Sequence, residues 1–104
     1  MPSMKAIYTK AGAQDLVDLT VYRLQFNEAS VVEKLLDKID GEVKRLEKNP
    51  NIGSWLKNRI EKETDYRYIV CDKYLIFYEI GNDEVSITRI LDGRQNWQNA
   101  LLGG

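Results

Sequence analysis

The side chains best suited to chemistry in this sequence are four basic residues near the ends of expected strands, Lys57, Arg59, Arg67 and Arg94. Ammonium and guanidinium groups can stabilise negative charge that develops on a phosphate, and they need no metal to do so. These basic residues could instead have structural roles. Charged side chains on an exposed edge strand discourage pairing with other sheets, which would account for Lys57 and Arg59. Arg67 could pair with an acid such as Glu79 across a sheet.

The composition excludes several other kinds of site. The chain has no histidine, which rules out Ser-His and Cys-His nucleophilic pairs and histidine metal sites. Its single cysteine, Cys71, can form neither an internal disulfide nor a zinc site. A lone free thiol is typical of a reducing compartment. We therefore expect neither a metal nor a cofactor.

Length and charge bound the remaining possibilities. A chain of 104 residues is long enough for one core, so we expect residues 1–104 to form a single domain. Its 15 basic and 16 acidic residues give a net charge of -1, which does not by itself indicate a nucleic-acid-binding protein. No apolar run approaches the ~18 residues of a membrane span, and the first residues lack the apolar core of a signal peptide. We expect a cytoplasmic protein with no membrane partner.

Three strands are expected to follow one another in the C-terminal half of the chain, over residues 66–70, 74–80 and 84–91. They are rich in β-branched and aromatic residues, and the polar segments 71–73 and 81–83 separate them. Strands joined by such short turns form consecutive antiparallel hairpins.

Two helices are expected before these strands, because apolar residues recur there at three- and four-residue steps. The first series is Ala13, Leu16, Val17, Thr20 and Leu24, and the second is Val32, Leu35, Leu36, Ile39, Val43 and Leu46. Asn27 or Ser30 could cap the second helix, and Glu33 follows Ser30 at capping-box spacing. Pro50 ends that helix, because proline cannot continue it.

The remaining elements are expected to be short. Residues 5–9 read as a first strand and residues 54–60 as an edge strand, with Lys57 and Arg59 alternating outward. Residues 96–102 could form a last helix, and Arg89 is expected on the solvent face of its strand. The resulting order is β-α-α-β-β-β-β, an α+β fold with a helical hairpin packed on a mainly antiparallel sheet.

With these elements in place, the sequence resembles the RelE/ParE superfamily of bacterial toxins, also called plasmid-stabilisation proteins. The resemblance covers nearly the whole chain. It depends on the segments at residues 13–16, 46–50, 66–70 and 75–80, and most specifically on the closing Ile-Thr-Arg-Ile-Leu-Asp-Gly-Arg at residues 87–94. It implies the toxin of a type II toxin–antitoxin pair, held inactive by a cognate antitoxin.

Members of this superfamily divide into two activities, and the resemblance leaves both open. RelE-like toxins are endoribonucleases that cleave mRNA on the ribosome, whereas ParE-like toxins poison DNA gyrase. The nuclease is slightly favoured, because Lys57, Arg59, Arg67 and Arg94 could converge as its catalytic residues. Arg67 and Arg94 match the basic positions of RelE-like nucleases best.

Two departures from the nuclease pattern favour other interpretations. Asp92 stands where the superfamily usually has a histidine before Gly-Arg, and the C-terminal segment has no tyrosine. A non-enzymatic domain that only binds the antitoxin is therefore the alternative. Trp55 and Trp97 could anchor core edges or bind a partner. We expect the antitoxin to cover the surface near Trp55, Lys57 and Arg67.

Overall fold

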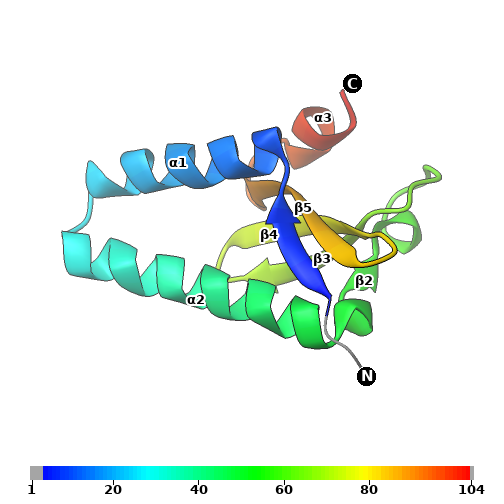
Figure 1. Cartoon of the computed structure of the whole chain (residues 1–104). Coiled ribbons are helices and arrows are strands. Elements are labelled where there is room, and N and C mark those ends of the chain that lie inside the picture. The colour runs from blue at the N-terminus through cyan, green and yellow to red at the C-terminus, as the bar shows by residue number, and fades with distance from the viewer. Residues whose placement is uncertain (1–3, 104) are drawn as a thin grey trace.

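The computed structural model describes residues 4–103, which form two helices, a five-stranded sheet and a short C-terminal helix (Figure 1). In chain order the elements are β1 (Lys5–Tyr8), α1 (Lys10–Leu24), α2 (Ala29–Lys48), the 3₁₀ turn η1 (Pro50–Ile52), β2 (Ser54–Trp55), the 3₁₀ turn η2 (Leu56–Asn58), β3 (Arg67–Cys71), β4 (Tyr74–Ile80), β5 (Glu84–Asp92) and α3 (Trp97–Leu102). The predicted α+β order is confirmed.

The sheet has the strand order β1-β5-β4-β3-β2. The predicted antiparallel meander β3-β4-β5 forms its centre, and β1 lies parallel to β5 at one edge. Figure 1 shows α1 and α2 as an antiparallel hairpin whose connection lies far from β2 and α3. The hairpin returns the chain from one edge of the sheet to the other.

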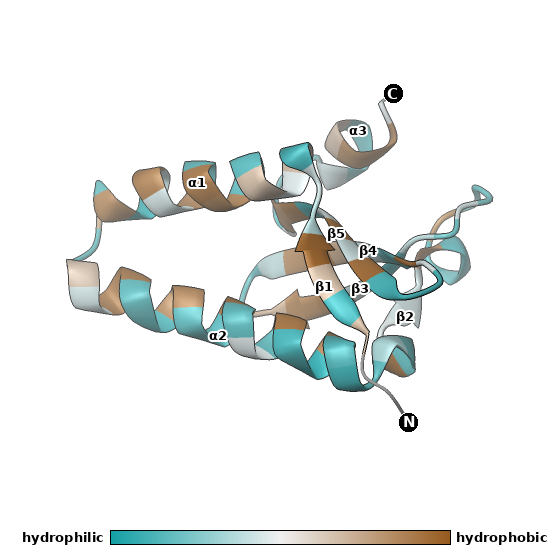
Figure 2. Ribbon diagram, viewed as in Figure 1, coloured by the Kyte–Doolittle hydropathy of each residue, from teal (hydrophilic) through white to brown (hydrophobic). Residues whose placement is uncertain are grey.

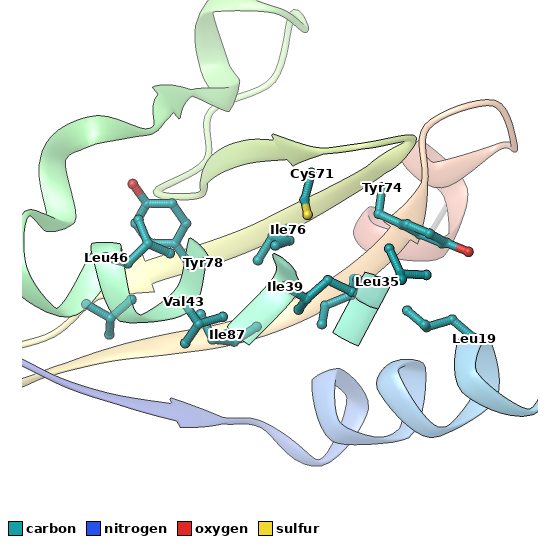
Figure 3. Packing of buried hydrophobic residues seen from close by; sticks show 12 residues of the cluster. Leu19, Leu35, Ile39, Val43, Leu46, Cys71, Tyr74, Ile76, Tyr78 and Ile87 are labelled. Carbon is teal, nitrogen blue, oxygen red and sulfur yellow. The ribbon is translucent and has the colours of Figure 1, made fainter. Parts of the chain in front are cut away.

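The apolar stripe predicted for α2 packs against the sheet. Its buried residues follow the 3.6-residue period and meet the inward side chains of β4 and β5, Ile76, Tyr78 and Ile87 (Figure 3). Helix α1 is different: only Gly12 and Leu19 are buried. Apolar residues of α1, such as Val17 and Val21, therefore remain exposed. Figure 2 shows that much of this helix is hydrophobic in sequence.

The predicted edge strand over residues 54–60 is wrong beyond Trp55. Leu56 is fully buried in a second apolar cluster on the other face of the sheet, beside Leu75, Phe77 and Trp97. To insert this side chain the backbone turns into η2, where the N–H groups of residues 59 and 60 donate to the Leu56 carbonyl. Lys57 and Arg59 therefore lie in and just after a turn, not on a strand.

The predicted cap of α2 is also wrong. The helix begins at Ala29, with Glu28 as the N-cap residue and no side-chain capping bond, so Ser30 lies inside its first turn. The Asn27 amide instead donates to the Arg23 carbonyl at 3.0 Å and so satisfies the end of α1.

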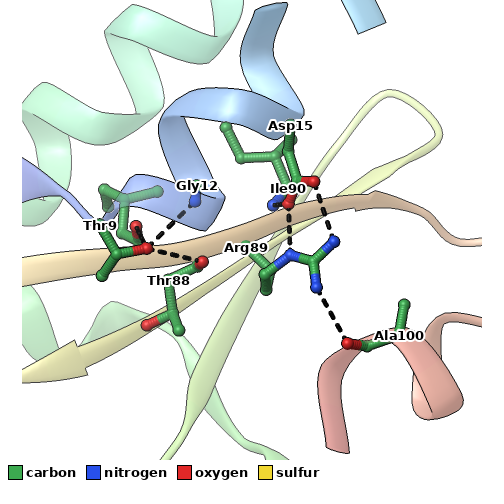
Figure 4. A network of polar contacts seen from close by, with 8 residues as sticks. Thr9, Gly12, Asp15, Thr88, Arg89, Ile90 and Ala100 are labelled. Atoms are coloured by element: carbon green, nitrogen blue, oxygen red, sulfur yellow. Dashed lines mark hydrogen bonds and ion pairs between the residues drawn. The ribbon is translucent and has the colours of Figure 1, made fainter. Parts of the chain in front are cut away.

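The first turn of α1 caps the edge of β5 where β1 ends (Figure 4). The Thr9 hydroxyl accepts from the Gly12 N–H at 3.0 Å and donates to the Thr88 carbonyl at 3.0 Å. A Cβ at residue 12 would collide with the Ile87 carbonyl oxygen, so this approach requires glycine. Backbone groups that β1 does not reach thus gain partners from the helix.

Asp15 completes this junction, and Arg89 is not the solvent-facing residue that was predicted. The Asp15 carboxylate accepts from Arg89 Nε and Nη2 at 2.6 and 2.9 Å, and from the Ile90 N–H at 3.0 Å. Arg89 Nη1 also donates to the Ala100 carbonyl of α3 at 2.9 Å. One ion pair therefore joins α1, β5 and α3 (Figure 4).

Within residues 4–103, none of the helices combines the length and the hydropathy that crossing a membrane requires.

We predict that Asp15→Asn lowers the free energy of unfolding by about 2 kcal/mol, because it leaves the Arg89 guanidinium, only 25% exposed, without its counter-charge. Urea denaturation followed by circular dichroism measures this change. Asp37→Asn, at an exposed position on α2, is the control and should stay within about 0.5 kcal/mol of the parent. Equal effects of both substitutions would contradict the role assigned to the junction.

Candidate functional site

Two of the four basic residues meet at Trp55, the residue that ends β2. The Arg67 guanidinium lies 3.8 Å from the centroid of the indole, and Lys57 Nζ lies 5.0 Å from it. Both distances are within the range of cation–π attraction. Arg67 Nη1 also donates to the Gly53 carbonyl at 2.9 Å. We call Trp55, Lys57 and Arg67 the Trp55 corner.

Tyr78 holds the backbone that shapes the Trp55 corner. Its buried hydroxyl donates to the Pro50 carbonyl at 2.7 Å and accepts from the Gly53 N–H at 2.9 Å. Burial raises the pKa of the Tyr78 phenol, so the hydroxyl keeps the proton that it donates. The turn before β2 is therefore fixed to the middle of the sheet.

Arg67 is not paired with Glu79, which was one of the structural interpretations. The two residues line a shallow hollow of about 260 Å³ together with Asp65, but no ion pair joins them. The Arg67 Nε atom is buried and has no hydrogen-bond partner within residues 4–103. Arg67 is held instead by the Gly53 carbonyl and by the indole of Trp55.

Arg59 lies elsewhere, over the second apolar cluster. Its guanidinium is 5.4 Å from the ring centroids of both Tyr68 and Trp97. Trp97 is only 7% exposed and packs against Phe77 at a centroid distance of 5.3 Å. Trp55 is 36% exposed. Of the two tryptophans considered for partner binding, Trp55 is therefore the more accessible to a partner.

The sheet places Arg59 and Arg67 on opposite faces. Arg67 stands opposite Tyr78 in the β3–β4 register, whereas Tyr68 stands opposite Phe77. Successive side chains of a strand point to opposite faces, and paired residues share one. Arg67 therefore shares the face of α2, and Arg59, which covers Tyr68, shares the face of α3.

Arg94 is separated from the other three basic residues. Asp92 pairs with Tyr74 in the sheet, and Arg67 pairs with Tyr78, four residues further along β4. At ~3.3 Å per residue this is a separation of about 13 Å along the strand. The four side chains thus occupy three places, and the structure brings together only Lys57 and Arg67.

Asp92 binds the Arg94 side chain directly. The guanidinium donates from Nε and Nη2 to the two carboxylate oxygens at 3.2 and 3.1 Å, and the Arg94 N–H donates to Asp92 Oδ1 at 2.9 Å. These bonds from Arg94 hold the pKa of Asp92 below its usual value. The negative charge of Asp92 is therefore balanced by the positive charge of Arg94.

Between Met4 and Gly103 no group of three or more histidine, cysteine, aspartate or glutamate side chains could hold a metal ion. Cys71 is a free, buried thiol, and burial raises its pKa.

Sequence reasoning missed an apolar groove between α1 and α2, with a volume of about 500 Å³. Leu16, Val17 and Val21 form one wall, and Leu36 and Ile39 form the other. Val17 and Val21 are each more than half exposed. The sequence did contain an indication of this groove, because α1 has more apolar residues than the single stripe with which a helix covers a sheet.

Comparisons with known proteins agree with this architecture. Residues 6–97 match the family described as "ParE toxin of type II toxin-antitoxin system, parDE". A solved structure described as "Chromosomal ParDE TA system from P. aeruginosa" has a similar fold, with a TM-score of 0.71 and 19% identity over 88% of this chain and 98% of that one. No curated protein matches the sequence.

The pair of Asp92 and Arg94 should give stability a measurable pH dependence. Because the folded pKa of Asp92 is lower than the unfolded value of about 3.9, its stabilisation is complete above that value and is lost as pH falls through the folded pKa. Asp92→Asn should therefore be less stable than the parent at pH 7, and the difference should shrink below about pH 4.

Thermal denaturation of both proteins from pH 7 to pH 3 measures this difference. Glu33→Gln, an exposed position on α2, is the control for the loss of one carboxylate, and Asp92→Asn is compared with it at each pH. A difference for Asp92→Asn that stays constant down to pH 3 would rule out the proposed linkage.

Proposed function

Because this chain belongs to the family of ParE toxins of type II toxin–antitoxin systems, we propose that it is the growth-inhibiting member of such a pair and that it acts on DNA gyrase. The observation that carries the choice of gyrase is the dispersal of the four basic side chains over three places on the sheet. An mRNA nuclease of this superfamily would need those cations around one phosphate.

The state of each cation supports the same choice. The Arg94 guanidinium is already neutralised by Asp92, and Arg67 is engaged by Trp55 and a backbone carbonyl. Residues 95–104 contain no tyrosine, and the chain has no histidine, so neither of these two groups is available there to donate or accept a proton. A net charge of -1 also provides no general attraction to ribosomal RNA.

The antitoxin of the pair is proposed to bind the groove between α1 and α2. An apolar groove between two helices suits the apolar face of an amphipathic helix, which is a common mode of peptide recognition. The half-exposed valines at positions 17 and 21 would lose their contact with water there. We keep the proposal that the antitoxin also extends over the Trp55 corner, where Trp55 remains accessible.

Purified protein should inhibit supercoiling by gyrase, and its expression should stop growth and accumulate cleaved DNA–gyrase complexes. Primer extension on cellular mRNA from the same cultures should show no new cleavage sites. The variant Lys57→Gln/Arg94→Gln should inhibit growth as the parent does, because neither cation is assigned a role at gyrase.

Two other outcomes would contradict the proposal and favour a different function. Cleavage of mRNA that disappears in the double variant would establish the nuclease and refute the gyrase target. Normal growth during expression, with antitoxin binding intact, would identify a domain that only binds its antitoxin.

We further predict that Val21→Glu weakens binding of the cognate antitoxin at least tenfold, because it places a charge in the apolar groove. Isothermal titration calorimetry measures the change. Val70→Glu is the matched control, because Val70 is exposed to a similar extent, 58% against 56% for Val21, but lies on β3 away from the groove. Unchanged affinity for Val21→Glu would place the antitoxin elsewhere.

A further inference from the structure

A second hollow, of about 260 Å³, lies on the other side of α1, between that helix and the ends of β4 and β5. Three carboxylates line it, those of Asp15, Asp18 and Asp92, and its apolar floor includes Leu19. Tyr74 of β4 forms part of its wall. We call this hollow the Tyr74 pocket.

Tyr74 is a buried residue whose side chain lines this pocket. The residue is 5% exposed, yet its hydroxyl has no hydrogen-bond partner within residues 4–103. Figure 3 shows the ring at the end of the core cluster near Leu19, with the hydroxyl directed away from the other core residues. The Tyr74 hydroxyl oxygen is not among the fully buried polar atoms that lack a partner, so it is the accessible tip of an otherwise buried side chain and can bind a polar group that enters the pocket.

The carboxylates of the pocket differ in what they already bind. Asp15 is paired with Arg89, and Asp92 is paired with Arg94. Asp18 accepts only from the Gln14 side chain, at 2.8 Å, and is paired with no cation among the residues described. It is therefore the carboxylate available to an incoming positive charge.

Other charges near the Tyr74 hydroxyl do not occupy the pocket. Burial raises the pKa of Tyr74 and keeps the phenol protonated, while Arg23 and Arg94 act in the opposite direction. Neither arginine lines the pocket. The charged side chains that line it are three carboxylates, and Asp18, the one without an arginine partner among the residues described, favours a cationic ligand.

We propose that the Tyr74 pocket receives one lysine or arginine side chain of the antitoxin, with its charged group between Asp18 and the Tyr74 hydroxyl. The aliphatic part of such a side chain would lie on the apolar floor. The volume is slightly below the ~300–1,000 Å³ of small-molecule sites, so a single side chain fits it better than a metabolite.

The choice of the antitoxin rests on the proposed function and on the position of α1. Asp15, Asp18, Leu19 and Tyr22 are spaced three and four residues apart and form one side of this helix. The apolar groove proposed for the antitoxin lies on its other side. A chain bound in that groove needs only to cross α1 to reach the Tyr74 pocket.

The exposed aromatic rings at the end of α1 make this surface continuous. Tyr22 and Phe26 are 58% and 70% exposed, and their ring centroids lie 5.2 Å apart. Tyr22 also lines the Tyr74 pocket. Exposed apolar surface next to a charged pocket is typical of protein–protein interfaces.

The first test uses a probe that needs no antitoxin. Titration of the chain with ethylguanidinium, followed by NMR, should shift the signals of residues that line the Tyr74 pocket, such as Leu19, in a saturable manner. Asp18→Asn, a surface substitution on α1, should weaken this binding at least tenfold, and Tyr74→Phe should weaken it measurably. Shifts that do not saturate, or that are equal in Asp18→Asn, would overturn the pocket's cation preference.

The second test is a double-mutant cycle with the antitoxin. Each lysine and arginine of its toxin-binding segment is changed to glutamine, alone and together with Asp18→Asn, and affinities are measured by calorimetry. At one position of the antitoxin, the change to glutamine should lower the affinity for the parent chain at least tenfold but should change the affinity for Asp18→Asn little. Tight binding without such coupling would overturn this inference, whereas a parent chain that binds no antitoxin would refute the proposed function instead.

Discussion

The fold depends on satisfying one edge of β5, the edge that β1 and α1 share. Strand β1 pairs with it only as far as Ile87, and an open edge beyond that point would leave backbone groups without partners. The N-terminal end of α1 supplies them, through its N-cap residue Thr9 and through Asp15. Because Asp15 also binds Arg89, which reaches α3, the same contact sets the positions of both helices relative to the sheet.

The alternation of side chains across the sheet then decides what its basic residues can do. Arg67 and Tyr68 are neighbours on β3 and therefore point to opposite faces of the sheet. Arg67 lies on the face of α2, whereas Tyr68, which Arg59 covers, lies on the face of α3. Aromatic rings hold these cations in place, and a carboxylate holds Arg94. This scaffold can therefore carry several cations near its strand ends and hold them in separate places.

The sequence predicted the regular elements well, because the period of α2 and the turns between β3, β4 and β5 are local signals. It failed where a contact distant in sequence decided the structure. Burial of Leu56 under α3 ended β2 after two residues, and the carboxylate of Asp15 drew Arg89 out of solvent. The Tyr74 pocket could not be foreseen either, since its walls come from residues more than 70 positions apart.

The hydroxyl that fixes the turn before β2 also constrains how this protein can evolve. Gly53 lies so close to the Tyr78 ring that a Cβ at position 53 would occupy the place of the hydroxyl. The same Cβ would lie 2.9 Å from the backbone carbonyl oxygen of Tyr68, which a smaller side chain at position 78 would not move. This turn therefore requires glycine at position 53 for two separate reasons, one from a side chain 25 residues away in the sequence and one from the neighbouring strand.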